Sequence, residues 1–197
     1  MVPRPRGVAS VTNVCSACHV LQSQLFDESP HKAAFEAAGL PGCVTCHSNH
    51  DIERPSDAML SSSDKAICIT CHTDGDAGLQ TAAEIHSKLQ DLQDSIAHSK
   101  DILDRAAQSG MEVGQPQLDL IQAGDALTKG RVAVHSVRAA KVEQELTSGK
   151  AVAEKTYQAG LQALRERNYR RIGLSISLLV IGATLIGLRL WIREIER

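Results

Sequence analysis

Six cysteines form three pairs with identical spacing, and a histidine directly follows each pair. The pairs are Cys15 and Cys18, Cys43 and Cys46, and Cys68 and Cys71, followed by His19, His47 and His72. Each motif reads C-x-x-C-H, the haem c attachment pattern. Two thiols three residues apart can each form a thioether with a haem vinyl group, and the adjacent imidazole can bind the iron from one face. The spacing predicts three covalent haems with these histidines as proximal iron ligands.

Zinc ribbons, redox dithiols and disulfide frameworks also use paired cysteines. Histidine makes up 8 of the 197 residues, so its chance appearance after all three pairs has a probability of about 10⁻⁴. A four-cysteine zinc site would also leave one pair over. The pattern therefore favours haem over these alternatives.

A low-spin electron-transfer haem needs a second axial ligand, which sets much of its potential. His31 lies between the first two motifs, just after Pro30, and His50 follows His47 by three residues and could ligate a neighbouring haem. We expect both to be distal ligands. For the third position we favour His135, with His86 as the alternative.

Other side chains are weaker candidates for this role. We expect His98 to be a solvated surface residue, and Met59 or Met111 could replace a histidine ligand.

The middle of the chain is expected to be helical. Thr81 and Glu84 form a capping box at the start of a helix, and apolar residues then recur at alternating steps of four and three, as in a narrow coiled-coil seam. The seam residues are Ile85, Leu89, Leu92, Ile96 and Leu103, with Ser99 in the missing place. The helix is expected to stop near residues 109–110.

A second helix is expected to restart at residues 114–116, with Pro116 in its first turn, and to continue to Arg171. Its weaker seam runs through Ile121, Thr128, Val132, His135, Ala139, Val142 and Leu146. Kinks are expected at its glycines, each of which weakens a helix by about 1 kcal/mol relative to Ala. The glycines are Gly124, Gly130, Gly149 and Gly160.

The short connection predicts that the two helices pack antiparallel. A turn near Glu112 would place Leu89 opposite His135 and bring both His86 and His135 to the base of the hairpin, near the haems. Residues 149–171 would then run on toward the membrane as an overhang of about 35 Å at 1.5 Å per residue. The haems would lie at mid-height, with the hairpin tip pointing away from the bilayer.

Residues 172–188 carry no charge and are long enough, at the short end, to cross a membrane. Arg189 can extend to the interface and Trp191 suits it. Arginines are about equally dense on both sides, so their distribution does not decide the orientation. Haem attachment, which normally takes place outside the cytoplasm, puts the N-terminal side in the periplasm.

The expected fold is mostly α, with little regular structure around the haems. The expected parts are a trihaem cytochrome domain (1–79), a long antiparallel helical hairpin or stalk (80–171), one transmembrane helix (172–192) and a short cytoplasmic tail (193–197).

The three motifs resemble class III-type bacterial multihaem c-type cytochromes with bis-histidine ligation. The stretch from Cys46 to Leu60 and the segment from Gly130 to Ser136 look like family members that continue into a helical hairpin and a C-terminal membrane helix. The resemblance implies periplasmic electron transfer, with His31, His50 and His135 as distal ligands. Such proteins usually have a signal peptide and often more haems upstream. Residues 1–6 contain no apolar stretch of that kind, so we expect a fragment, a processed form or a misassigned start.

We therefore expect an electron carrier rather than an enzyme, anchored in a bacterial inner membrane as part of a hetero-oligomer. Its partners would be a membrane-embedded redox complex or other cytochromes. The net charge of −2 gives no basic signature for nucleic acid.

The alternatives to an electron carrier are a membrane-anchored quinol dehydrogenase and a structural subunit of a respiratory or photosynthetic complex. Residues 1–79 hold 5 Lys/Arg against 9 Asp/Glu, which fits either a basic partner face or an ordinary acidic surface.

Overall fold

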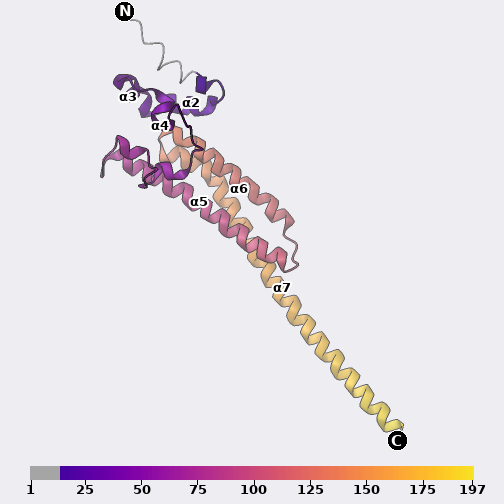
Figure 1. Ribbon diagram of the computed structural model, residues 1–197. Helices are drawn as coiled ribbons and strands as arrows, with labels where there is room; N and C mark the ends of the chain where they lie inside the picture. The colour runs from indigo at the N-terminus through magenta and orange to yellow at the C-terminus, as the bar shows by residue number, and fades with distance from the viewer. Residues whose placement is uncertain (1–13) are drawn as a thin grey trace, which may run out of the picture.

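The computed structural model describes residues 14–197, and within this range the chain forms helices and no strands. This confirms the expected mostly α class. The described chain runs from a segment of short helices at one end to the end of a single very long helix at the other (Figure 1). Residues 1–13, to which the expectation about N-terminal processing applies, lie outside the described range.

Residues 14–76, here called the cysteine-rich segment, contain short helices joined by loops. These are α2 (Val20–Asp27), α3 (Pro30–Ala38), α4 (Gly42–His47) and the two 3₁₀ turns η1 (Asp57–Leu60) and η2 (Cys68–Thr70). Pro30 occupies the first position of α3, where its missing N–H costs nothing. Gly39 ends that helix with a φ of 69°, which a glycine adopts without strain. The small amount of regular structure agrees with the sequence prediction.

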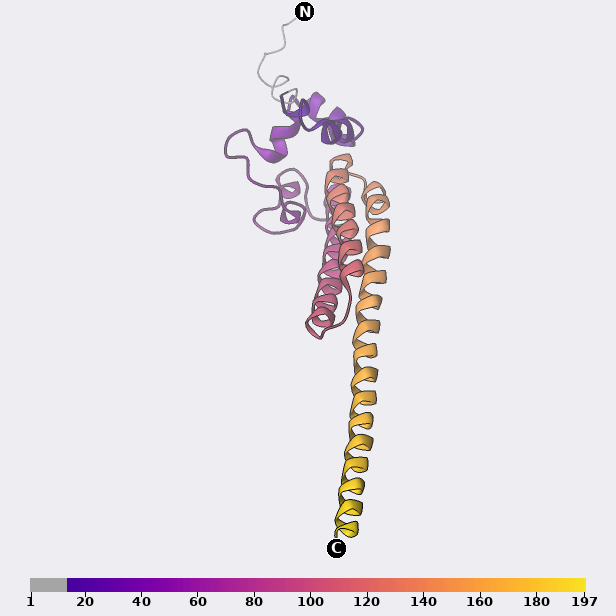
Figure 2. The same cartoon turned by 90° about the vertical axis from the view of Figure 1, so that its right-hand side faces the viewer.

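Three helices form a bundle next to this segment: α5 (Ala77–Gln108), α6 (Gly114–Ala133) and α7 (Ala139–Ile195). As expected, α5 and α6 form an antiparallel hairpin, which turns at residues 109–113. The chain then passes through η3 (Val134–Ser136), and α7 runs back beside both helices and on past their turn (Figure 2).

The expectation of one continuous second helix is wrong, because the chain reverses at residues 134–138. Val137 takes a φ of 52°, a left-handed conformation that is rare for a β-branched residue. As a result, the hairpin tip points in the same direction as the C-terminal part of α7, and the cysteine-rich segment sits at the opposite end of the bundle (Figure 2). Most of the expected overhang is instead packed on α5 and α6: Gly149, Ala153, Thr156, Gly160 and Ala163 are buried.

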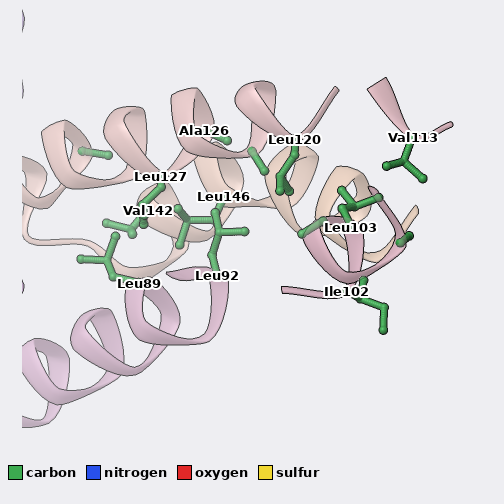
Figure 3. Packing of buried hydrophobic residues seen from close by; sticks show 14 of the residues in the cluster. Leu89, Leu92, Ile102, Leu103, Val113, Leu120, Ala126, Leu127, Val142 and Leu146 are labelled. Atoms are coloured by element: carbon green, nitrogen blue, oxygen red, sulfur yellow. The ribbon is translucent and has the colours of Figure 1, made fainter. Parts of the chain in front are cut away.

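The bundle core consists mainly of leucines and small residues from all three helices (Figure 3). The seam expected on α5 is confirmed, since Ile85, Leu89, Leu92 and Leu103 are at most 1% exposed. Ser99 is also buried, and its hydroxyl donates to the carbonyl of Ala153 on α7 at 2.7 Å.

The seam expected on the second helix is only partly right. Val142 and Leu146 are fully buried, but Ile121 is 59% exposed and Thr128 also faces solvent. The buried face of α6 consists of Leu120, Ala123, Ala126, Leu127, Gly130 and Ala133. The expected apolar repeat crosses the helix break at residues 134–138, so its residues before and after the break do not lie on one helix face.

The start of α5 also differs from expectation. Asp76 is the N-cap, and its carboxylate accepts a hydrogen bond from the Leu79 N–H at 2.8 Å. Thr81 lies inside the helix, where its hydroxyl donates to the carbonyl of Ala77. Aspartate is as good a cap as threonine or better, so the helix begins one turn earlier.

Two glycines of α7, Gly149 and Gly160, serve close packing, and both lie inside one continuous helix rather than at a helix break. A Cβ on Gly149 would lie 2.7 Å from the Cβ of Ala126 and 3.3 Å from the carbonyl oxygen of Ala123. Gly160 makes a similarly close approach to Ile102. These glycines let α7 approach its neighbours closely.

We expect Gly149→Ala to destabilise the bundle by about 1 to 2 kcal/mol, because overpacking outweighs the gain in helix propensity. The matched control is Gly124→Ala on α6, where nothing lies within 4 Å of the added methyl group. That change should stabilise the bundle by up to about 1 kcal/mol. Denaturant unfolding followed by circular dichroism measures both, and equal effects of the two variants would contradict the packing role.

The last part of α7 is apolar and exposed. Its most apolar 18-residue window has a mean hydropathy of 1.9, and none of that window is buried against the rest of the protein. Within residues 14–197, α7 alone is long and apolar enough to cross a membrane.

Candidate haem-binding site

All three C-x-x-C-H motifs adopt a helical turn. The backbone N–H of His19 donates to the carbonyl of Cys15 at 2.9 Å, and that of His72 donates to Cys68 at the same distance. The middle motif lies inside α4. In such a turn, residues i, i+3 and i+4 share one face. Each motif therefore presents two thiols and one imidazole on the same side, the arrangement that one covalently bound haem requires.

The imidazole of His47, at the end of α4, faces the imidazole of His135 in η3. Their ring centroids are 6.0 Å apart and the ring planes differ by 24°. Two imidazoles on opposite sides of one metal ion, each with a metal–nitrogen bond of about 2.0 Å, have centroids about 6 Å apart. The separation of His47 and His135 fits a shared iron.

A second pair has the same separation. The centroids of His31 and His72 are 6.0 Å apart, with planes at 32°. His31 also stacks on Phe35 at 5.2 Å, which holds its ring in place. His72 lies against the first turn of α5, where a Cβ on Gly78 would overlap its ring at 2.2 Å. The spacing again fits one iron between two histidines.

In both pairs, one histidine has its Nδ1 engaged by an acceptor. Nδ1 of His135 lies 2.9 Å from the Val132 carbonyl oxygen, and Nδ1 of His72 lies 3.1 Å from the Asp76 carboxylate. Hydrogen bonds from the Leu79 and Thr73 N–H groups lower the pKa of Asp76, so it stays ionised and accepts. A proton held on Nδ1 leaves Nε2 as the lone-pair donor, the usual arrangement at histidines that bind a metal.

Burial keeps two of the facing imidazoles neutral. It lowers the pKa of His31, and the nearby His72 lowers it further. Burial also lowers the pKa of His47, followed by the neighbouring charges of His135 and His19. A neutral imidazole is the form that binds a metal, so both are ready to ligate at neutral pH.

Some of the groups that shift these pKa values belong to neighbouring motifs. His47 of the middle motif interacts with His19 of the first. Burial raises the pKa of the Cys46 thiol, and the nearby thiols of Cys68 and Cys71 in the third motif raise it further. The middle motif therefore lies close to both of the others.

The remaining histidines make no ring contact with another imidazole within residues 14–197. His19 is exposed, and so is His50, which lies in a turn where the Ser48 hydroxyl donates to its carbonyl at 2.9 Å. His86 is half-buried and lines a groove of about 680 Å³ between η1, α5 and α6. His98 is exposed, as expected. The distal roles of His50 and His86 stay predictions.

Charged pairs far apart in the sequence attach the cysteine-rich segment to the bundle. Arg131 on α6 makes two hydrogen bonds to Asp57 in η1, at 2.9 and 2.7 Å. Lys141 on α7 pairs with Glu28 at 2.8 Å. These pairs could not have been predicted from the sequence, because their partners lie far apart along the chain.

The helix-capping role of Asp76, by contrast, could have been predicted, because an aspartate just before a helical pattern is a preferred cap.

Residues 31–77 match the family described as the doubled CXXCH motif. The match covers the second and third motifs together with His31 and His50. With the helical fold and the paired imidazoles, it supports a multihaem c-type cytochrome-like protein, a haem-binding class that transfers electrons. No curated protein and no solved structure matches the chain.

Proposed function

We propose that this chain is a membrane-anchored trihaem cytochrome that relays electrons between a membrane redox complex and a periplasmic or extracellular acceptor. The observation that carries the proposal is the set of three C-x-x-C-H turns, two of which hold a proximal histidine facing a second imidazole at 6.0 Å.

The facing imidazoles suggest which histidines share an iron. The second haem would be held by Cys43, Cys46 and His47, with His135 as its distal ligand. The third would be held by Cys68, Cys71 and His72, with His31 as its distal ligand. The first, on Cys15, Cys18 and His19, would take His50 or His86. The iron and porphyrin supply the electron chemistry, and these residues attach, orient and ligate them.

The order of the motifs suggests an order of transfer. His47 lies near His19, and Cys46 lies near Cys68 and Cys71. The second haem would therefore be the intermediate site between the first and third. Histidine at both axial positions gives a lower potential than a histidine–methionine pair, so all three haems should have negative potentials.

The apolar end of α7 would be the membrane anchor, with the cysteine-rich segment on the periplasmic side of a bacterial inner membrane. From Ala139 to Arg171, α7 rises about 50 Å at 1.5 Å per residue. The haems would lie at the end of the bundle farthest from the bilayer. This distance disfavours direct oxidation of a membrane quinol and favours a redox partner that reaches the haems from above the membrane.

Potentiometric titration of the purified, haem-loaded full chain tests the relay. We expect three one-electron steps at negative potentials, and no reduction of the haems when a quinol is added to the isolated protein in detergent. Three strongly positive potentials would contradict bis-histidine ligation, and rapid quinol oxidation by the chain alone would instead make it a quinol dehydrogenase.

A further inference from the structure

A small pocket lies where the three-helix bundle ends and the apolar part of α7 begins. It has a volume of about 290 Å³ and is lined by Gln108, Ser109, Arg167 and Arg171. Two of these residues come from the end of α5 and its turn, and two come from α7. The pocket thus joins the hairpin tip to the start of the apolar segment.

The pocket is positively charged, and no carboxylate lines it. Arg167 is held in place by hydrogen bonds to the Ser109 hydroxyl at 2.8 Å and to the Asn168 side chain. The nearby Glu166 is engaged by Arg170. Within residues 14–197, the guanidinium of Arg171 makes no side-chain hydrogen bond or ion pair, and it is exposed. A pre-positioned arginine and one with all its donors unused meet in one pocket.

The C-terminus of α5 carries a partial negative charge that works against an anion here, equivalent to about half a charge. The carbonyls of Arg105, Ala106 and Ala107 in its last turn are already engaged, because the Ser109, Gly110 and Met111 N–H groups donate to them. Two full guanidinium charges exceed the remaining dipole, so the pocket still attracts an anion.

The position of the pocket indicates which anion. Arg171 directly precedes Ile172, the first residue of the uncharged stretch 172–188. If that stretch spans the bilayer, the pocket lies at the level of the lipid headgroups. Arginine forks bind phosphate oxygens through two parallel hydrogen bonds.

We propose that this pocket binds a phosphate group, supplied by the headgroup of an anionic phospholipid. The proposal rests on the membrane anchor proposed above. A bound headgroup would attach the hairpin tip to the membrane surface beside the span and so hold the bundle, and the haems at its far end, in one orientation.

Native mass spectrometry of the haem-loaded full chain in detergent tests the site, with phosphatidylglycerol or phosphatidylcholine added in equal amounts. We expect preferential retention of phosphatidylglycerol, reduced about fivefold by Arg171→Gln and by Arg167→Gln. Arg165→Gln is the matched control, because Arg165 lies on the same side of the span but does not line the pocket. It should retain the lipid as the unaltered chain does.

Two further experiments test the lipid source of the phosphate and the membrane anchor separately. Inorganic phosphate at millimolar concentration should not displace the lipid, and displacement would overturn the lipid as the source of the phosphate. Equal retention of both lipids, or an equal loss in Arg165→Gln, would overturn the site itself. Alkaline carbonate washing of membranes tests the anchor separately: release of the chain contradicts the proposed span, whatever the lipid preference in detergent.

Discussion

The double variant Cys43→Ser/Cys46→Ser is expected to bind two haems and to lose rapid electron exchange between them. Without thioethers, the middle haem cannot be retained covalently at His47, and its position between the first and third motifs is left without an electron carrier. Exchange between the two remaining haems should slow by an order of magnitude or more, because the electron must then cross the gap left by the middle haem in one step. Rapid photoreduction followed by absorbance at the haem bands measures the rate.

The matched control for this variant is Cys15→Ser/Cys18→Ser. It also lacks one haem, but it keeps the second and third motifs, whose cysteines lie close enough to interact. Exchange between its two haems should stay as fast as in the unaltered chain. If both double variants slow exchange equally, or if neither does, the second haem is not the intermediate site.

Replacing His135 is expected to change the ligation of one haem only. In His135→Ala the iron that we propose is held by His47 would lose its distal ligand and become high-spin. In His135→Met it should stay six-coordinate, with its potential raised by about 100 mV or more, within the ~0.8 V range that axial ligands set. The variants should keep their helical content, because His135 is only half-buried and lies in a 3₁₀ turn.

Optical and electron paramagnetic resonance spectra measure the spin state, and a redox titration measures the potential. His98→Ala is the control, since His98 is exposed on α5 and should leave all spectra unchanged. His86→Ala tests the alternative ligand in the same way. An unchanged low-spin spectrum in His135→Ala would show that His135 does not bind iron.

The helical turn at each C-x-x-C-H motif was predictable from the sequence because the motif is local. Two cysteines and a histidine within five residues define each motif, and the turn that unites them needs no distant contact. The buried seam of α5 was predictable for the same reason, since Leu89, Leu92 and Leu103 repeat at helical spacing within one uninterrupted helix.

The reversal after α6 was not predictable from local signals. Residues 134–138 contain neither glycine nor proline, and Val137 adopts a positive φ that its residue type disfavours. The turn is supported by contacts made only in the folded protein, such as the hydrogen bond from the Arg138 side chain to the Glu28 carbonyl at 3.2 Å. His135 was expected at the base of the hairpin, and it lies there, in η3 directly after α6, where it faces His47.

The glycines of α7 show how tertiary packing overrides helix propensity. Gly149 and Gly160 were expected to bend the helix, as isolated helical propensities suggest. They instead lie where α7 meets Ala126 and Ile102 of its neighbours. A sequence read one helix at a time does not reveal the partner that such a glycine approaches.

The most direct test of the central claim is a count of covalently bound haems on the purified full chain. A pyridine haemochrome assay, combined with the intact mass measured under denaturing conditions, gives that number. Three haems per polypeptide, retained after denaturation, are expected. A colourless chain, or one that carries zinc at its cysteine pairs, would contradict the proposed role as an electron carrier.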